Sequence, residues 1–97
     1  MTTAKRWHVE IFLDEHDDER RTRAEARLQT GDNTHLIGVG TAHRNPTDVE
    51  VPEIGDEVAA ARALFALGHE LLLAAAVDIE AVAREKARLH IRAHPEG

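Results

Sequence analysis

The sequence has 97 residues, which is the size of one small domain with a thin hydrophobic core. It contains no cysteine, which excludes disulfide bonds and thiolate metal sites and fits a reducing compartment. No apolar run follows the positive charges near the N-terminus, so we expect a cytosolic protein without a secretory signal. The formal net charge of -6 excludes a uniformly basic nucleic-acid binder.

The charge is unevenly distributed along the chain. Residues 1–44 hold seven Lys or Arg and eight Asp or Glu, residues 45–80 hold one and eight, and residues 81–97 hold four and two. The middle third therefore carries the whole negative excess. We expect a polyanion to approach the first or last third of the chain and to be repelled by the middle.

Alternating apolar residues predict a first strand over Trp7–Leu13, with Phe12 as an apolar exception on its polar face. The next segment, Asp14–Arg21, is charged throughout and predicts a solvated connection. It is too short to hold a packed helix and two turns. We therefore expect the first strand to be followed directly by a second one.

Two further strands are predicted over Thr22–Gln29 and Leu36–His43, separated by the turn residues 31–33. Together the three strands form an antiparallel meander. Gly38 and Gly40 share one face of the third strand. Alternating glycines in a strand indicate close approach by another backbone, and a helix is the simplest candidate.

Capping residues set the expected helix boundaries. Pro46–Gly55 contains two prolines and a glycine and predicts a loop. Asp56 is then expected to cap the long helix, because its carboxylate can accept hydrogen bonds from the free N–H groups of the first turn. Asp78 is expected to cap a second, shorter helix that ends near Leu89.

The long helix is apolar or small almost all the way round, since only Arg62, His69 and Glu70 are polar between Val58 and Val77. A helix on one sheet needs an apolar stripe of about 100°, so another surface must cover this one. The polar side chains near its middle make membrane insertion expensive. We therefore predict a homodimer and no membrane contact. The candidate packing and dimer residues are Leu64, Phe65, Leu67, Leu71 and Leu72.

These elements define an α+β fold of the order β-β-β-α-α, in which a three-stranded antiparallel meander is followed by a long helix on one face and a shorter C-terminal helix. We expect a single domain over residues 1–97, with an ordered core over 6–90. The two ends, 1–5 and 91–97, are expected to be loose.

No catalytic or metal-binding constellation is present. His69-Glu70 lacks the second histidine of a His-Glu-x-x-His site, and the acidic run at 14–19 lacks the glycine and closing glutamate of a calcium loop. Gly38-Val-Gly40 lacks the third glycine of a dinucleotide fingerprint. Ser, Cys and Tyr are absent. We therefore predict no enzymatic activity, no cofactor, no metal and no small-molecule substrate.

Arginines provide the strongest binding hypothesis. If the strands pair as a hairpin, five guanidiniums form one patch that suits phosphates, because each can donate two parallel hydrogen bonds. The alternative is a solvated, salt-bridged face, since Glu25 lies among them and aromatic platforms are scarce. The candidate nucleic-acid-binding residues are Arg20, Arg21, Arg23, Arg27 and Arg44.

Several short motifs resemble a family of small actinobacterial proteins of unknown function, whose mycobacterial members are linked to hypoxia and dormancy. The motifs are Trp7-x-Val9-x-Ile11, Asp14-Glu-His16, Thr22-Arg-Ala-Glu-Ala-Arg-Leu28, Leu36-Ile-Gly-Val-Gly40, Asn45-Pro46, Val51-Pro-Glu-Ile-Gly-Asp-Glu57 and Asp78-Ile-Glu-Ala81. The match spans about residues 7–83, and the motif that begins at Val51 is the most distinctive.

The resemblance implies a sheet-plus-helix homodimer, compared in shape with ribosome hibernation factors, and a role in silencing translation. Hibernation factors of the usual kind have a helix between their first two strands and are strongly basic, unlike this chain. Where the family favours Arg then Leu before Asn-Pro, this sequence has His43 and Arg44. Two hypotheses follow: a stress-associated protein that binds the ribosome or RNA, or a homodimeric protein-interaction or structural module without nucleic-acid contact.

Overall fold

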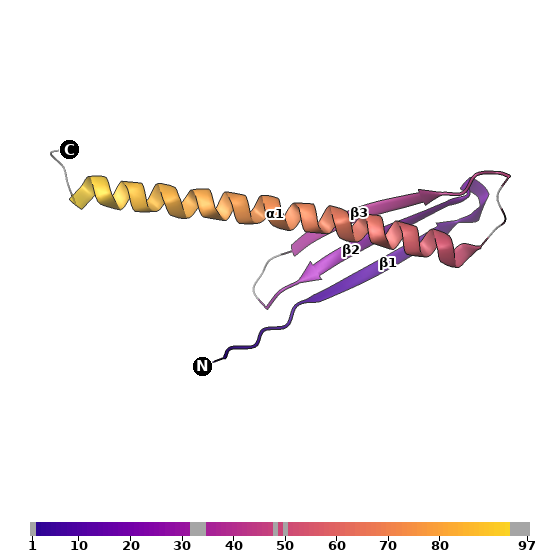
Figure 1. Cartoon of the computed structure of the whole chain (residues 1–97), viewed down its shortest axis with the longest axis horizontal. Helices are drawn as coiled ribbons and strands as arrows, with labels where there is room; N and C mark the ends of the chain where they lie inside the picture. The colour runs from indigo at the N-terminus through magenta and orange to yellow at the C-terminus, as the bar shows by residue number, and fades with distance from the viewer. Residues whose placement is uncertain (1, 32–34, 48, 50, 94–97) are drawn as a thin grey trace.

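A computed structural model describes residues 2–31, 35–47, 49 and 51–93, with side chains through residue 91. Three strands precede one long helix, and a short 3-10 turn joins the first two strands (Figure 1). The elements are β1 (His8–His16), η1 (Asp17–Glu19), β2 (Arg21–Gln29), β3 (His35–His43) and α1 (Pro52–Ala93).

The strands form one antiparallel sheet in the order β1-β2-β3, which confirms the predicted meander. β1 is longer than predicted, because the segment from Asp14 to His16, expected in the connection, pairs with the first residues of β2. Every residue of β1 is exposed. An edge strand open to solvent tolerates charged side chains, so the charge run does not end the strand.

The expected second helix is wrong, since α1 continues without a break to Ala93. No glycine or proline occurs between Gly68 and the end of this helix, and Ala, Leu, Glu, Arg and Lys favour helix throughout. Asp78 is therefore an exposed residue within α1 rather than a cap. Residues 91–93, expected in a loose tail, are helical, and 94–97 lie outside the described residues.

The start of α1 also differs from the prediction. The helix begins at Pro52, four residues before the predicted cap at Asp56. Proline suits the first helical position, because its fixed φ matches the helix and its missing N–H would have no partner there. The amide of Ile54 donates to the Val51 carbonyl at 3.0 Å in this first turn.

The hydrophobic core is built almost entirely from small residues between α1 and the sheet. Alternate positions of β2 meet one face of the helix, and Gly38 and Gly40 of β3 lie against the α1 backbone, as their spacing predicts. A Cβ atom at Gly40 would lie 2.5 Å from the Ala59 carbonyl oxygen. The buried core residues are Ala24, Ala26, Leu28, Ala42, Ala59, Ala63 and Leu67.

The molecule is elongated, with extents of 72 × 33 × 19 Å and a radius of gyration of 20.7 Å, against about 13 Å for a compact chain of this length. The cause is α1, whose 42 residues span about 63 Å, while a strand of 9 residues spans about 30 Å. In Figure 1 the C-terminal half of α1 therefore projects past the sheet.

Candidate functional site

The face of α1 that is turned away from the sheet carries exposed apolar residues at heptad spacing. They follow the alternating three- and four-residue steps of a helix that pairs with another helix. We call this set the helix seam; it consists of Phe65, Leu72, Ala75, Ile79, Val82 and Leu89, and the two remaining positions of the repeat hold the half-buried Gly68 and the charged Lys86. Phe65 is 80% exposed, Leu72 72% and Ile79 68%. Large apolar side chains this open to water indicate a surface that lacks its partner.

The five predicted packing residues divide between the core and the surface. Leu67 is buried and Leu71 packs against the core, so these two hold α1 on the sheet. Phe65 and Leu72 belong to the helix seam, and Leu64, which is 44% exposed, lies beside it.

A second apolar surface lies on β1. Val9, Ile11 and Leu13 share the face of the sheet that α1 covers, since they pair with Leu28, Ala26 and Ala24. α1 lies over β3 and β2 and scarcely reaches β1. These three side chains remain 38–43% exposed. The chain therefore leaves part of its own sheet uncovered.

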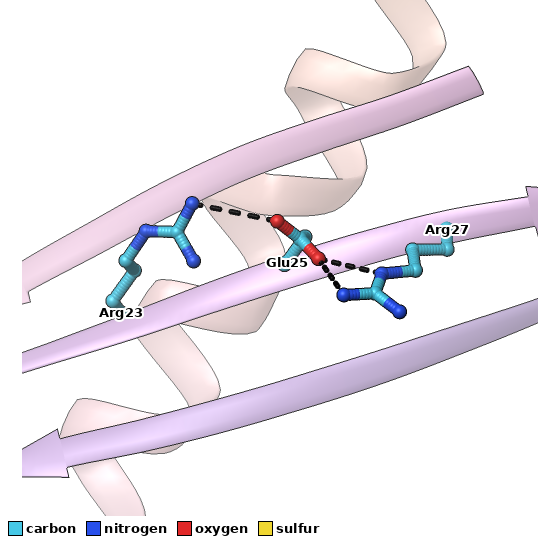
Figure 2. A network of polar contacts seen from close by, with 3 residues as sticks. All are labelled: Arg23, Glu25 and Arg27. Carbon is cyan, nitrogen blue, oxygen red and sulfur yellow. Dashed lines mark hydrogen bonds and ion pairs between the residues drawn. The ribbon is translucent and has the colours of Figure 1, made fainter.

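The outer face of the sheet, opposite α1, carries Arg23 and Arg27 on either side of Glu25 (Figure 2). Arg23 Nη2 lies 3.4 Å from Glu25 Oε1, and Arg27 donates to Glu25 Oε2. The hydrogen bond from Arg27 holds the pKa of Glu25 below its ordinary value. Glu10 and Asp14 of β1 are the register partners of Arg27 and Arg23. This face is consequently charge-balanced rather than positive.

Phe12 also lies on the outer face, between the register partners of the two arginines. The guanidinium carbon of Arg27 stacks 4.2 Å from the centroid of the Phe12 ring, a cation–π contact. Two further exposed apolar side chains, Ile37 and Val39 of β3, lie on the same face on the other side of β2. The position of Phe12 could be inferred from the sequence, because it is out of phase with the apolar residues around it.

The other three predicted arginines lie at one end of the sheet. Arg20, Arg21 and Arg44 line a cavity of about 460 Å³ between η1, the end of β3 and the start of α1, together with Arg62. Arg62 Nη1 donates to the Thr41 carbonyl at 2.7 Å. The structure therefore separates the predicted patch into an outer-face pair and an end-cavity group. The role of Arg62 was not predicted, because it becomes visible only when α1 is laid along β3.

A pair of carboxyl groups lies at the same end of the molecule. The hydrogen bond between the side chains of Glu15 and Asp56 raises the pKa of Glu15 above its ordinary value of 4.5, and the Asp56 charge acts in the same direction. Asp56 Oδ1 is buried and lacks a donor among the described residues. A proton on Glu15 supplies that donor, so the pair joins β1 to α1 best when it holds one proton.

This pair predicts a pH dependence of folding stability. A carboxyl group with a raised pKa in the folded chain binds its proton more tightly there than in the unfolded chain. The stability it contributes is present below the unfolded pKa near 4.5 and is lost as the pH rises through the raised folded pKa. We expect the free energy of unfolding of Glu15→Gln to vary less between pH 4 and 7 than that of wild type. At pH 7 the variant should be more stable than wild type, as measured by urea unfolding. Equal profiles would contradict it.

Among residues 2–31, 35–47, 49 and 51–93, no three His, Asp or Glu side chains gather in a way that could hold a metal ion. Residues 52–91 of α1 are long and apolar enough to cross a membrane by length and composition, with a hydropathy of 1.5 in the most apolar window. Core helices of soluble proteins pass the same test, so this observation carries little weight alone.

The chain is similar in sequence to known proteins over most of its length. A family model described as Rv2632c-like matches residues 5–88. The chain is 52% identical over 83 residues to uncharacterized protein Mb1767 of Mycobacterium bovis, covering 86% of this chain and 85% of the relative. It is 43% identical over 77 residues to uncharacterized protein Rv2632c of Mycobacterium tuberculosis, covering 79% and 80%.

A solved structure has the same fold. The crystal structure of Rv2632c aligns with a TM-score of 0.74 at 41% identity, and the alignment covers 84% of this chain and 93% of that chain. The resemblance to mycobacterial proteins of unknown function is thus confirmed. Because the family match spans most of the chain and its relatives match over most of their own length, the chain belongs to the Rv2632c-like family.

Proposed function

We propose that this chain is a homodimeric interaction module in which the helix seams of two copies pack against each other. The observation that carries the proposal is the heptad spacing of exposed apolar side chains on the face of α1 that its own sheet does not use. Identical helices with a 3.5-residue apolar repeat bury that repeat by pairing, and the slight drift of the repeat is taken up by supercoiling.

The thin core supports the same proposal. Among the described residues, the largest buried side chains are Leu28 and Leu67, and the remainder are alanines. Burial of one leucine side chain contributes about 2 kcal/mol, so alanine-on-alanine packing leaves the fold marginal. A second copy on the helix seam adds the apolar burial that the single chain lacks.

The C-terminal half of α1 gives an independent reason. Every residue with a described side chain from Ala75 to Ile91 is exposed. A helix of about 20 residues without tertiary contacts is marginally stable in water. The Arg88–Glu85 ion pair at 2.8 Å adds only about 0.3 kcal/mol. Pairing with a second copy would stabilise this segment.

Light scattering with a matched pair of variants tests the homodimer. We expect wild type at micromolar concentration to have twice the chain mass of 10.7 kDa. The double variant Leu72→Glu/Ile79→Glu places charge on the helix seam and should be monomeric. Val77→Glu is the control, because Val77 is 61% exposed but lies opposite the seam; it should remain dimeric. A monomeric wild type, or equal dissociation of both variants, would refute the proposal.

A second candidate function, binding of the ribosome or RNA to silence translation under stress, is favoured by one observation. Phe12 stacks with Arg27 on the outer face and is 43% exposed, and exposed aromatic rings beside arginines can stack unpaired bases. The balanced charge of this face ranks it second. The acidic side chains Glu10, Asp14 and Glu25 oppose a polyanion there.

Cosedimentation with ribosomes tests this second candidate. Binding through phosphates releases counterions, so the bound fraction should fall between low and moderate salt. Phe12→Ala should reduce it, while Phe65→Ala, an exposed aromatic on the opposite side of the molecule, should not. Absence of wild-type binding at low salt, with folded protein present, would exclude this function.

A further inference from the structure

We propose that the cavity at the end of the sheet is a binding site for a small amphipathic anion, a molecule with one carboxylate or phosphate group on an apolar body. This cavity is lined by Arg20, Arg21, Arg44 and Arg62, among others, and has a volume of about 460 Å³. Its lining includes residues at the start of α1, and the C-terminal part of the helix seam lies at the other end of that helix. The site is therefore independent of the homodimer.

The charged part of the cavity suits an anionic group. Four arginines from three parts of the chain line it: Arg20 and Arg21 at the start of β2, Arg44 directly after β3, and Arg62 in the third turn of α1. Guanidinium groups donate paired hydrogen bonds to carboxylate and phosphate oxygens. The N-terminal end of α1 also lines the cavity, and its helix dipole favours negative charge.

Two features of the arginines indicate a function for the cavity. Arg20 has φ 51° and ψ 41°, and it is the single non-glycine residue with positive φ among the described residues. This left-handed conformation is strained for an arginine, whose Cβ atom crowds the backbone, and unstrained for a glycine. Arg21 Nε is buried without a hydrogen-bond partner among the described residues, whereas Nη2 of the same side chain pairs with Glu19 at 3.0 Å. An acceptor oxygen seated beside Arg21 would supply the missing partner.

The backbone holds this arrangement in place. The Arg20 amide donates to the Asp17 carbonyl at 3.1 Å, and the Arg20 carbonyl accepts from the Arg44 amide at 2.8 Å. Two of the arginines are thus tied together through their main chains. Two backbone hydrogen bonds hold this strained turn in one conformation. A site built on it is preorganised for its ligand, which lowers the conformational entropy lost on binding.

The rest of the lining suits an apolar body. Ala42, Val51, Ile54 and Val58 contribute hydrocarbon from the end of β3 and the start of α1. Cavities of roughly 300–1,000 Å³ with apolar walls and a few polar groups are typical of small-molecule sites. Glu15 and Asp17 also line the cavity, where the four arginines outnumber these two carboxyl groups.

Proton–nitrogen NMR titration of the full chain tests the site with defined probes. Octanoate and octyl phosphate carry the two anionic groups on the same tail, 1-octanol has the tail without charge, and acetate has the charge without the tail. We expect shifts from octanoate or octyl phosphate to concentrate at the amides of residues 15–22, 42–44 and 53–58. 1-octanol and acetate should bind at least about tenfold more weakly.

Three variants distinguish binding in the cavity from nonspecific electrostatic attraction to the chain. Arg20→Gly should weaken binding about tenfold yet keep or raise the melting temperature, because glycine adopts the left-handed backbone more easily. Arg62→Met should also weaken binding. Arg88→Ala, which changes the net charge equally at the exposed end of α1, should bind like wild type.

Three results would overturn the proposal. They are equal binding of 1-octanol and octanoate, shifts concentrated on the helix seam instead of the cavity, and Arg20→Gly binding as tightly as wild type. None of these depends on whether the chain is a dimer.

Discussion

Gly38→Ala is expected to destabilise the fold by about 3 kcal/mol or more. A Cβ atom at Gly38 would overlap backbone atoms of Ala63 and Leu67, and these cannot rotate away as a side chain can. The glycine has no positive φ, so the effect is steric and not a matter of backbone freedom. To accept the methyl group, α1 must move off β3 and lose its contact with the alanines of the core.

Gly68→Ala is the matched control for this prediction. Gly68 lies within α1 and a Cβ atom there would meet nothing within 4 Å. Alanine in place of glycine within a helix stabilises it by about 0.5–1 kcal/mol, so the two substitutions should have opposite signs. Urea unfolding of both variants gives the comparison. Equal stability of Gly38→Ala and wild type would show that α1 does not rest on the β3 backbone.

Leu67→Ala and Leu72→Ala are expected to separate folding from assembly. Leu67 is 3% exposed and is the largest side chain that α1 buries in the core, so its truncation should cost about 2–4 kcal/mol. Leu72, one and a half turns later, is 72% exposed and lies on the helix seam. Its truncation leaves the core intact and, in the proposed homodimer, removes contact only with the second copy.

Thermal melts at two protein concentrations distinguish these effects. A homodimer is stabilised by mass action, so the wild-type melting temperature should rise with concentration. Leu67→Ala should lower it by a similar amount at both concentrations. Leu72→Ala should match wild type in dilute solution and fall below it in concentrated solution. If Leu72→Ala lowered both equally, Leu72 would belong to the fold of the single chain.

The sheet could be predicted from the sequence because two local signals agree there. Apolar residues alternate along β2, and the glycines of β3 show where the helix must approach. The helix boundaries were harder to predict, since aspartate is a good N-cap where a helix begins but is also tolerated inside a helix. Asp56 lies inside α1 because the helix already begins at Pro52, and Asp78 lies inside it because favourable helix formers continue on both sides.

The candidate site could be predicted only in part. Strand alternation is enough to place Arg23, Glu25 and Arg27 on one face, and the structure shows them in contact. The end cavity depends on how α1 crosses the sheet, which brings Arg62 close to Arg20 and Arg44 from distant parts of the sequence. No sequence period encodes that crossing. The left-handed backbone at Arg20 could not be predicted either, because arginine has no preference for positive φ.

We propose that α1 packs through two apolar faces: one contacts its own sheet, and the other, the helix seam, contacts a second copy of the chain. Hydrogen exchange of wild type at two concentrations tests it most directly. The account predicts that amides from Leu72 to Leu89 are protected at high concentration and lose that protection on dilution, while the amides of β2 that bond within the sheet stay protected at both. Equally fast exchange of residues 72–89 at every concentration, with β2 protected, would contradict it.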